Sequence, residues 1–127
     1  MDHVMLPLSA ISIVLLAHWI ADFIFQSDYV GRNKGKSAKI LLGHVATYTA
    51  VMSVACLPLV MMFDITSKMY LFFILFNGVL HCVIDQFTSK VRAKVYNPDN
   101  THMFFVFVGL DQLAHTIILL SALSIIL

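Results

Sequence analysis

The chain has 127 residues, of which 60% are hydrophobic and only 12% are charged, and its formal net charge is +1. Too few polar residues are present to cover a soluble core, which excludes a soluble globular domain. The composition therefore indicates a membrane protein.

Four apolar runs follow one another, each close to the 20 or so residues that an α-helix needs to cross a bilayer. They span about residues 4–25, 40–63, 69–87 and 103–127. The first run has no Lys or Arg before it and no small-residue cleavage pattern after it, so we expect a retained helix and not a signal peptide. Because little chain remains outside the runs, we predict an all-α polytopic membrane protein, a single four-transmembrane-helix domain.

The basic residues gather in two of the three loops. Seven lie after the first or the third run, whereas only Lys68 lies in the other loop. The seven are Arg32, Lys34, Lys36, Lys39, Lys90, Arg92 and Lys94. The positive-inside rule then puts these loops in the cytoplasm and both termini outside. Attraction of these cations to anionic lipid, or to an anionic substrate, stays open beside this topological role.

Ionisable residues recur inside the runs, four residues apart. The first and third runs read His-x-x-x-Asp, and the fourth, antiparallel to them, reads Asp-x-x-x-His, while the second run adds a lone histidine. The seven residues are His18, Asp22, His44, His81, Asp85, Asp111 and His115. At 1.5 Å per residue, all seven fall roughly 5–20 Å below the cytoplasmic boundary. Residues four apart share a helix face, and a charge facing lipid costs several kcal/mol, so we expect all seven to face inward.

Four imidazoles and three carboxylates are ligands that bind Zn²⁺, with Mn²⁺ or Fe²⁺ as alternatives. Seven exceed what one tetrahedral ion requires, which suits one or two ions with a shell of orienting partners. Asp85 and Asp111 are the candidate catalytic residues, because they lie in the shallower layer, nearer the cytoplasm. Hydrogen bonds that merely satisfy buried groups, or a proton relay, are the alternative interpretations of the same residues.

Other polar residues carry weaker indications. Gln26, Gln86 and Gln112 lie beside a motif aspartate or one turn from it, so they either orient ligands or make interfacial hydrogen bonds. Cys56 and Cys82 lie in separate apolar runs and indicate neither a disulfide nor a thiolate metal site.

The segments HWIADFIFQSDYV, GHVATYT, HCVIDQF and DQLAH together resemble a family of small bacterial and phage-borne membrane proteins of unknown function. The resemblance covers nearly the whole chain and implies a multi-pass protein of the bacterial inner (cytoplasmic) membrane. More distantly, the helical setting and ligand types are similar to those of membrane-bound metal-dependent hydrolases, related to the zinc phospholipase C and P1 nuclease fold, in which helices supply His and Asp to a cluster of zinc ions.

Three functions fit these patterns. The first is a metal-dependent hydrolase, with zinc as the favoured metal, that acts on a lipid or phosphoester at the cytoplasmic leaflet and uses an aspartate as general base. The second is a non-enzymatic interaction protein in which metal staples the bundle. The third, a metal-ion carrier, is disfavoured because the outer halves of the helices offer only Ser, Thr and Cys as polar residues. We expect membrane lipids and no nucleic acid as partners, and homo-oligomerisation stays open.

The predicted orientation is testable by cysteine labelling. A cysteine introduced between residues 32 and 36 should be shielded from a membrane-impermeant thiol reagent in intact cells, because this basic loop is expected in the cytoplasm. A cysteine at Lys68, in the opposite loop, is the control and should label readily. Ready labelling of the first position in intact cells would reverse the assignment.

Overall fold

A computed structural model describes residues 5–127 of the chain, and within this range it contains helices and no strand. The elements in chain order are α1 (Leu8–Trp19), the π-helical turn η1 (Ile20–Ile24), α2 (Asp28–Asn33), α3 (Ala38–Ala55), α4 (Leu57–Phe63), α5 (Ser67–Val95) and α6 (Thr101–Ile126). The predicted all-α class is confirmed for the described residues.

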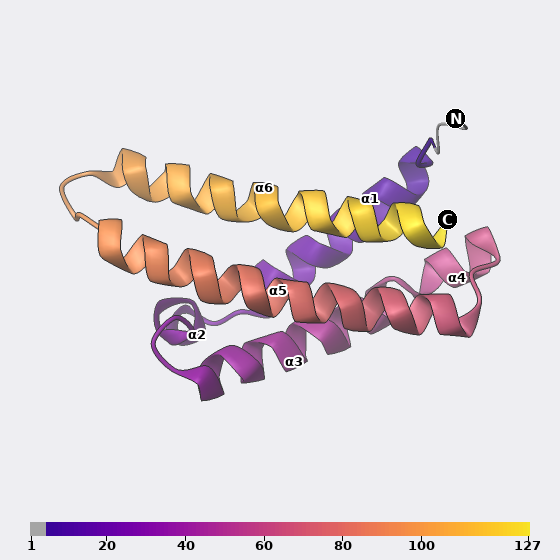
Figure 1. The fold of residues 1–127 in the computed structure, drawn as a ribbon, viewed down its shortest axis with the longest axis horizontal. Helices are drawn as coiled ribbons and strands as arrows, with labels where there is room; N and C mark the ends of the chain where they lie inside the picture. Colours follow the sequence, from indigo (N-terminus) through magenta and orange to yellow (C-terminus); the bar gives the residue numbers. More distant parts are fainter. Residues whose placement is uncertain (1–4) are drawn as a thin grey trace.

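Helices α5 and α6 form a long antiparallel hairpin, and they lie side by side along most of their length (Figure 1). Helix α3 packs against α5, and α1 crosses behind the hairpin, in contact with α3 and α6. The α5–α6 turn and α2 lie at one end of the molecule, while the start of α1, α4 and the C-terminus lie at the other. The two basic loops of the sequence therefore share one end, as the four-run pattern predicted.

Polar side chains cap the start of four helices. In each case the side-chain oxygen of the residue before the helix accepts a hydrogen bond from the backbone N–H three residues on, which satisfies one of the free donors of the first turn. These capping residues are Ser27 for α2, Ser37 for α3, Thr66 for α5 and Asn100 for α6. The caps fix where each helix begins, and so they fix which residues of the next turns face the interior.

The helices depart from the predicted runs in several places. The third run was predicted to end at residue 87, but α5 continues to Val95, so Lys90, Arg92 and Lys94 lie on its last turns and not in a loop. The second run, predicted as continuous over 40–63, is interrupted at Cys56, because Pro58 in the first turn of α4 has no N–H with which to continue α3. The first run ends in the π-turn, in which the Phe25 N–H donates to the carbonyl of Ile20, five residues back. Its predicted start at residue 4 lies outside the described residues.

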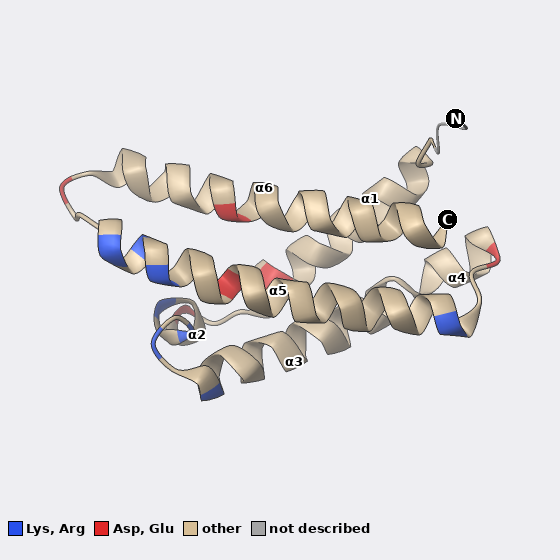
Figure 2. Ribbon diagram, viewed as in Figure 1, with Lys and Arg blue, Asp and Glu red and all other residues tan. Residues whose placement is uncertain are grey.

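Within residues 5–127, three helical stretches are long and apolar enough to cross a membrane: Ala38–Phe63, Ser67–Val95 and Thr101–Ile126. The helix over Leu8–Ile24 is apolar but shorter. Large apolar side chains are exposed along the outside of these helices, whereas Lys and Arg lie at the helix ends (Figure 2). A protein that spans a bilayer has an apolar exterior and carries its charged residues at the ends of its helices. The molecule therefore has the character of a membrane protein.

The apolar core lies towards the end that carries α4. Side chains from α1, α4, α5 and α6 meet there, among them Val14, Leu59, Phe73 and Leu119. The small residues Ala10, Ala17 and Ala21 let α1 approach its neighbours closely. The buried polar residues lie midway along the molecule, next to this core, so apolar packing on one side holds the helices that carry them.

Gly35, which follows α2, lies in close contact with α5. A Cβ at Gly35 would lie 2.7 Å from the Cβ of Ser89, so a methyl group has no room there. We expect Gly35→Ala to push α2 away from α5 and to lower the free energy of unfolding by about 1–3 kcal/mol. Gly43→Ala is the control, because nothing lies within 4 Å of a Cβ at that position. Thermal unfolding of both variants in the same detergent measures the difference, and equal melting temperatures would contradict the close approach.

Candidate metal centre

The buried ionisable residues lie at one depth. Asp85 precedes the end of α5 by ten residues, and Asp111 follows the start of α6 by ten residues, which is about 15 Å along each helix. The ribbon of α5 and of α6 accordingly carries an acidic position in the middle part of each helix (Figure 2). The common level that the reversed motif of the fourth run predicted is therefore present between α5 and α6.

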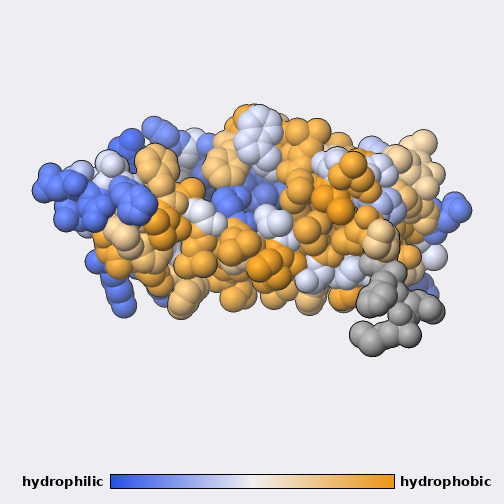
Figure 3. All heavy atoms as spheres, turned by 90° about the horizontal axis from the view of Figure 1, so that it is seen from above, coloured by the Kyte–Doolittle hydropathy of each residue, from blue (hydrophilic) through white to orange (hydrophobic). Residues whose placement is uncertain are grey.

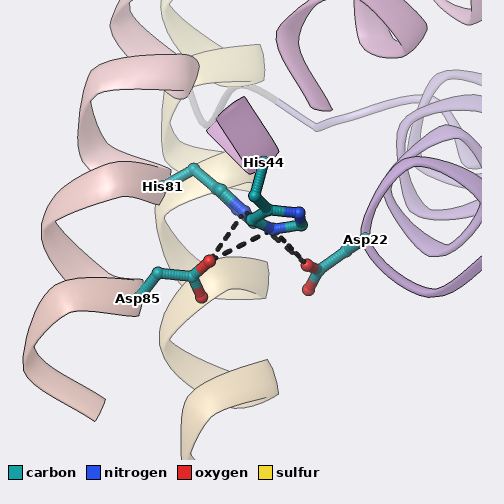
Figure 4. Close-up of side chains that lie close together, drawn as sticks. All are labelled: Asp22, His44, His81 and Asp85. Carbon is teal, nitrogen blue, oxygen red and sulfur yellow. Dashed lines mark hydrogen bonds and ion pairs between the residues drawn. The ribbon is translucent and has the colours of Figure 1, made fainter. Parts of the chain in front are cut away.

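One group of four residues converges from three elements: Asp22 from η1, His44 from α3, and His81 and Asp85 from α5 (Figure 4). The Nε2 atom of His44 lies 3.1 Å from Asp22 Oδ1, 3.2 Å from Asp85 Oδ2 and 3.1 Å from the Nε2 atom of His81. His81 Nε2 lies 3.3 Å from Asp85 Oδ2 and 3.6 Å from Asp22 Oδ1. All four side chains are almost fully buried.

These distances match the edges of a coordination tetrahedron. A zinc ion with bonds of 2.0–2.1 Å to nitrogen and oxygen has ligand atoms about 3.3–3.4 Å apart, and the five separations given above run from 3.1 to 3.6 Å. His44 Nε2 can carry a single ring N–H, yet three polar atoms lie within 3.2 Å of it, and which of them accept depends on the histidine tautomers. The group is therefore compatible with a metal site.

Lys34 supplies a cation whose place here no sequence pattern indicated. Its side chain is 6% exposed, and its Nζ donates a hydrogen bond of 2.7 Å to Asp85 Oδ2 and lies 3.9 Å from Asp22 Oδ1. In the sequence it looked like any other basic loop residue. The turn after α2 directs it inward, where it offsets part of the negative charge that two buried carboxylates bring together.

A second group of three consists of Asp22, Asp111 and His115. His115 Nδ1 donates to the backbone carbonyl of Asp111 at 2.9 Å, which leaves Nε2 as a free acceptor, the state in which histidine binds metals. Buried His115 Nε2 and Asp85 Oδ1 lie 3.7 Å apart, and neither has a hydrogen-bond partner within the described range. The Asp111 side chain is 14% exposed, so this group is the more open of the two.

A chain of hydrogen bonds supports both groups from the side of the apolar core. Asn77 donates to the Tyr48 hydroxyl at 3.0 Å, and this hydroxyl lies 2.9 Å from His18 Nδ1. His18 Nε2 lies 3.1 Å from the Gln112 side-chain oxygen. Since that oxygen only accepts, His18 carries its proton on Nε2, and Tyr48 donates to Nδ1.

The same glutamine ends the chain of hydrogen bonds at the carboxylates. The Gln112 amide nitrogen donates to Asp22 at 3.2 Å and to Asp111 at 3.1 Å, and Thr88 also donates to Asp111. The predicted orienting role of Gln112 thus has a geometric basis.

Six of the seven predicted ligands belong to the two groups, which share Asp22. His18 does not, because hydrogen bonds to Tyr48 and Gln112 occupy both of its ring nitrogens. Tyr48 was missed, although it also stacks on His81 with ring centroids 3.6 Å apart. Its position one turn after His44 in the same helix was the available signal.

The chain belongs to the family described as "Protein of unknown function (DUF3307)", whose match covers residues 11–127. No curated protein matches the chain. No solved structure matches it either. Membership of a family of unknown function, which the motifs indicated, is therefore established, and the more distant similarity to metal-dependent hydrolases stays a prediction.

The four-residue group predicts a metal content that can be measured directly. Protein purified without chelator should carry at least one equivalent of a divalent transition metal, and His44→Ala should weaken its binding by at least about tenfold. His102→Ala is the control, because His102 lies on the exposed first turn of α6. Elemental analysis of the purified proteins decides the matter, and wild-type metal content in His44→Ala would rule this group out as the site.

Proposed function

We propose that this member of the family is an integral membrane, metal-dependent hydrolase that acts on a lipid or phosphoester at the cytoplasmic leaflet. One observation carries the proposal: a closed group of four ligands and a more open group of three share one carboxylate, Asp22. Structural metal sites use four protein ligands, whereas catalytic sites use three and leave one position open. The open group is the one that a substrate can reach.

The residues present fit divalent cations in both groups, and zinc is the metal that we propose. Asp22, His44, His81 and Asp85 would hold one ion, while Asp111 and His115 would hold a second one together with Asp22. Bound zinc supplies Lewis-acid chemistry, since it polarises an ester or phosphoryl oxygen and activates water at neutral pH.

The protein's own side chains would hold the reacting groups in place. Asp111, partly exposed and oriented by Gln112 and Thr88, is positioned to accept a proton from an attacking water. Asp85 is more deeply buried, and Lys34 holds one of its oxygens. Of the two candidate catalytic residues, Asp111 is therefore favoured as the base, through the oxygen that it would not give to the ion, while Asp85 would act only as a ligand.

The proposed setting is the bacterial inner membrane, crossed four times, with the end that carries α2 and the α5–α6 turn in the cytoplasm and both termini outside. The apolar exterior and the cations at that end support this placement. The first helix, over Leu8–Ile24, is shorter than the other three, and a helix of this length crosses by drawing the bilayer thinner around it. An open group about 15 Å inside the helices then lies within reach of lipid in the cytoplasmic leaflet.

A metal-stapled interaction protein is the second candidate, and a specific observation favours it. The group of four is closed by ligand count and buried, as in structural sites. An ion there would stabilise the bundle whether or not chemistry occurs beside it.

Replacing Asp111 separates the two functions. Asp111→Asn keeps the size of the side chain and removes its basicity, so we expect hydrolysis to fall by at least about 100-fold, while the melting temperature and the metal bound by the group of four stay near wild type. Asp99→Asn, in the exposed α5–α6 turn, is the control. Mass spectrometry of products released from vesicles of phosphatidylglycerol and phosphatidylethanolamine measures the activity.

Two outcomes would favour the staple over the hydrolase. In one, Asp111→Asn loses stability together with the metal bound by the group of four, as a structural ligand would. In the other, wild type and Asp111→Asn show the same product release, including none.

A further inference from the structure

A groove of about 990 Å³ runs along the end of the molecule that carries α2. The segment 23–36 forms one wall, the start of α6 forms the other, and the last turns of α5 lie between them. The groove is outside both candidate metal groups, since none of the six ligands lines it. Its size is at the upper end for small-molecule sites.

The outer part of the groove is cationic. Arg32, Lys36 and Arg92 line it, and the one acidic residue among its lining is Asp28, which is exposed and pairs loosely with Arg32 at 3.5 Å. Such exposed ion pairs contribute little to stability, so Arg32 stays available to bind another anion. Arg92 is held across the groove by a 3.3 Å hydrogen bond that it donates to the carbonyl of Gly31.

The walls of the groove are aromatic. Phe23 stands on one side and Phe104 and Phe105 on the other, with Tyr96 near the α5–α6 turn. Phe104 meets Tyr96 edge-on, with ring centroids 6.4 Å apart. A groove that is cationic at its outer end and apolar along its walls matches a molecule that is anionic at one end and apolar along the rest.

The open metal group lies near the groove along α5 and α6. Phe104 lies seven residues before Asp111, two turns away on the same face of α6. Ser89, in the floor, follows Thr88, which donates to Asp111. The side-chain oxygen of Gln26, another lining residue, is buried without a hydrogen-bond partner in the described part of the chain, so it can accept from a bound hydroxyl.

The face that carries α1 and α6 shows hydrophilic atoms midway along its length, surrounded by apolar side chains (Figure 3). Asp111 and Gln112 are the polar residues of α6 at this level, and both are partly exposed. A partly exposed carboxylate inside an apolar belt costs several kcal/mol unless a polar group lies against it. Asp111 and Gln112 are thus accessible from the side of the molecule, towards the space that the bilayer would occupy.

We propose that this groove binds an anionic glycerophospholipid of the surrounding leaflet, its phosphate against Arg32, Lys36 and Arg92 and its apolar part against the aromatic walls. This rests on the proposed membrane function and names its substrate class. The lipid would enter sideways from the bilayer, and its glycerol region would lie towards Asp111. A lipid fits better than a free phosphate, because an ion would leave the aromatic walls uncovered.

The protein carries its own reporter for the experiment. Trp19 is the single tryptophan, is 50% exposed, and precedes Phe23 by four residues. Quenching of its fluorescence in vesicles that contain brominated phosphatidylglycerol or brominated phosphatidylcholine gives the relative affinity for the anionic and the zwitterionic lipid. We expect wild type to prefer the anionic lipid at least about tenfold, since each cation near a head group is worth about fivefold and three cations line the groove.

Two double variants with the same change in charge test the position of the site. Arg32→Gln/Lys36→Gln removes two cations from the groove and leaves Arg92, which has a structural hydrogen bond, in place. Lys90→Gln/Lys94→Gln removes two exposed cations at the same end of α5 that do not line the groove. The preference should fall to less than about threefold in the first variant and stay within about twofold of wild type in the second.

Three results would overturn the proposal: no lipid preference in wild type, an equal loss in both variants, or loss of the preference on adding millimolar glycerol phosphate, which would mark a site for a soluble phosphoester. Equal melting temperatures establish that the variants are folded. Because quenching needs no turnover, absence of hydrolysis with the lipid preference intact would remove the proposed enzyme and keep the lipid site. Loss of the lipid preference with hydrolysis intact would remove the lipid site and keep the proposed enzyme.

Discussion

Burial of charge inside an apolar bundle is the constraint on which the rest of this structure depends. Asp22 and Asp85 are almost inaccessible to solvent, and a carboxylate in that position is tolerable only if cations or hydrogen-bond donors surround it. Those partners come from different helices: Lys34 after α2, His44 from α3 and Gln112 from α6. These buried hydrogen bonds and ion pairs therefore fix the positions of the helices relative to one another. Moving any partner away would leave a buried charge without a partner.

The helices and the inward direction of the motif residues were predictable because both follow from local spacing. Two residues four apart share a face whatever the rest of the chain does, so spacing alone was enough to place the pair on α5, His81 and Asp85. The position of Lys34 could not be predicted, since a loop cation that serves topology and one that turns inward look alike in sequence. His18 shows the same limit. Whether it binds a metal or makes hydrogen bonds depends on Tyr48 and Gln112, which lie on other helices.

The short helix α2 links the two sites that we propose. Lys34, at its end, points inward to Asp85, while Arg32 and Lys36, two residues to either side, line the groove. Gly35 lets this turn press against α5. A shift of α2 would therefore change the charge balance around the buried carboxylates and the width of the groove at once. This gives one short segment influence over both the interior and the surface that would meet lipid.

The π-turn at Ile20–Ile24 gives the first helix a fixed residue count. A π-turn accommodates one residue more than the α-helix around it, and Asp22 sits inside it. Deleting one residue there would let the helix close into regular α geometry, so the turns on either side would keep their orientation, but Asp22 would lose the position that the wider turn gives it. Both candidate metal groups include Asp22, so both would be disturbed. Within this family, changes of length in that turn should therefore be far rarer than changes of side chain.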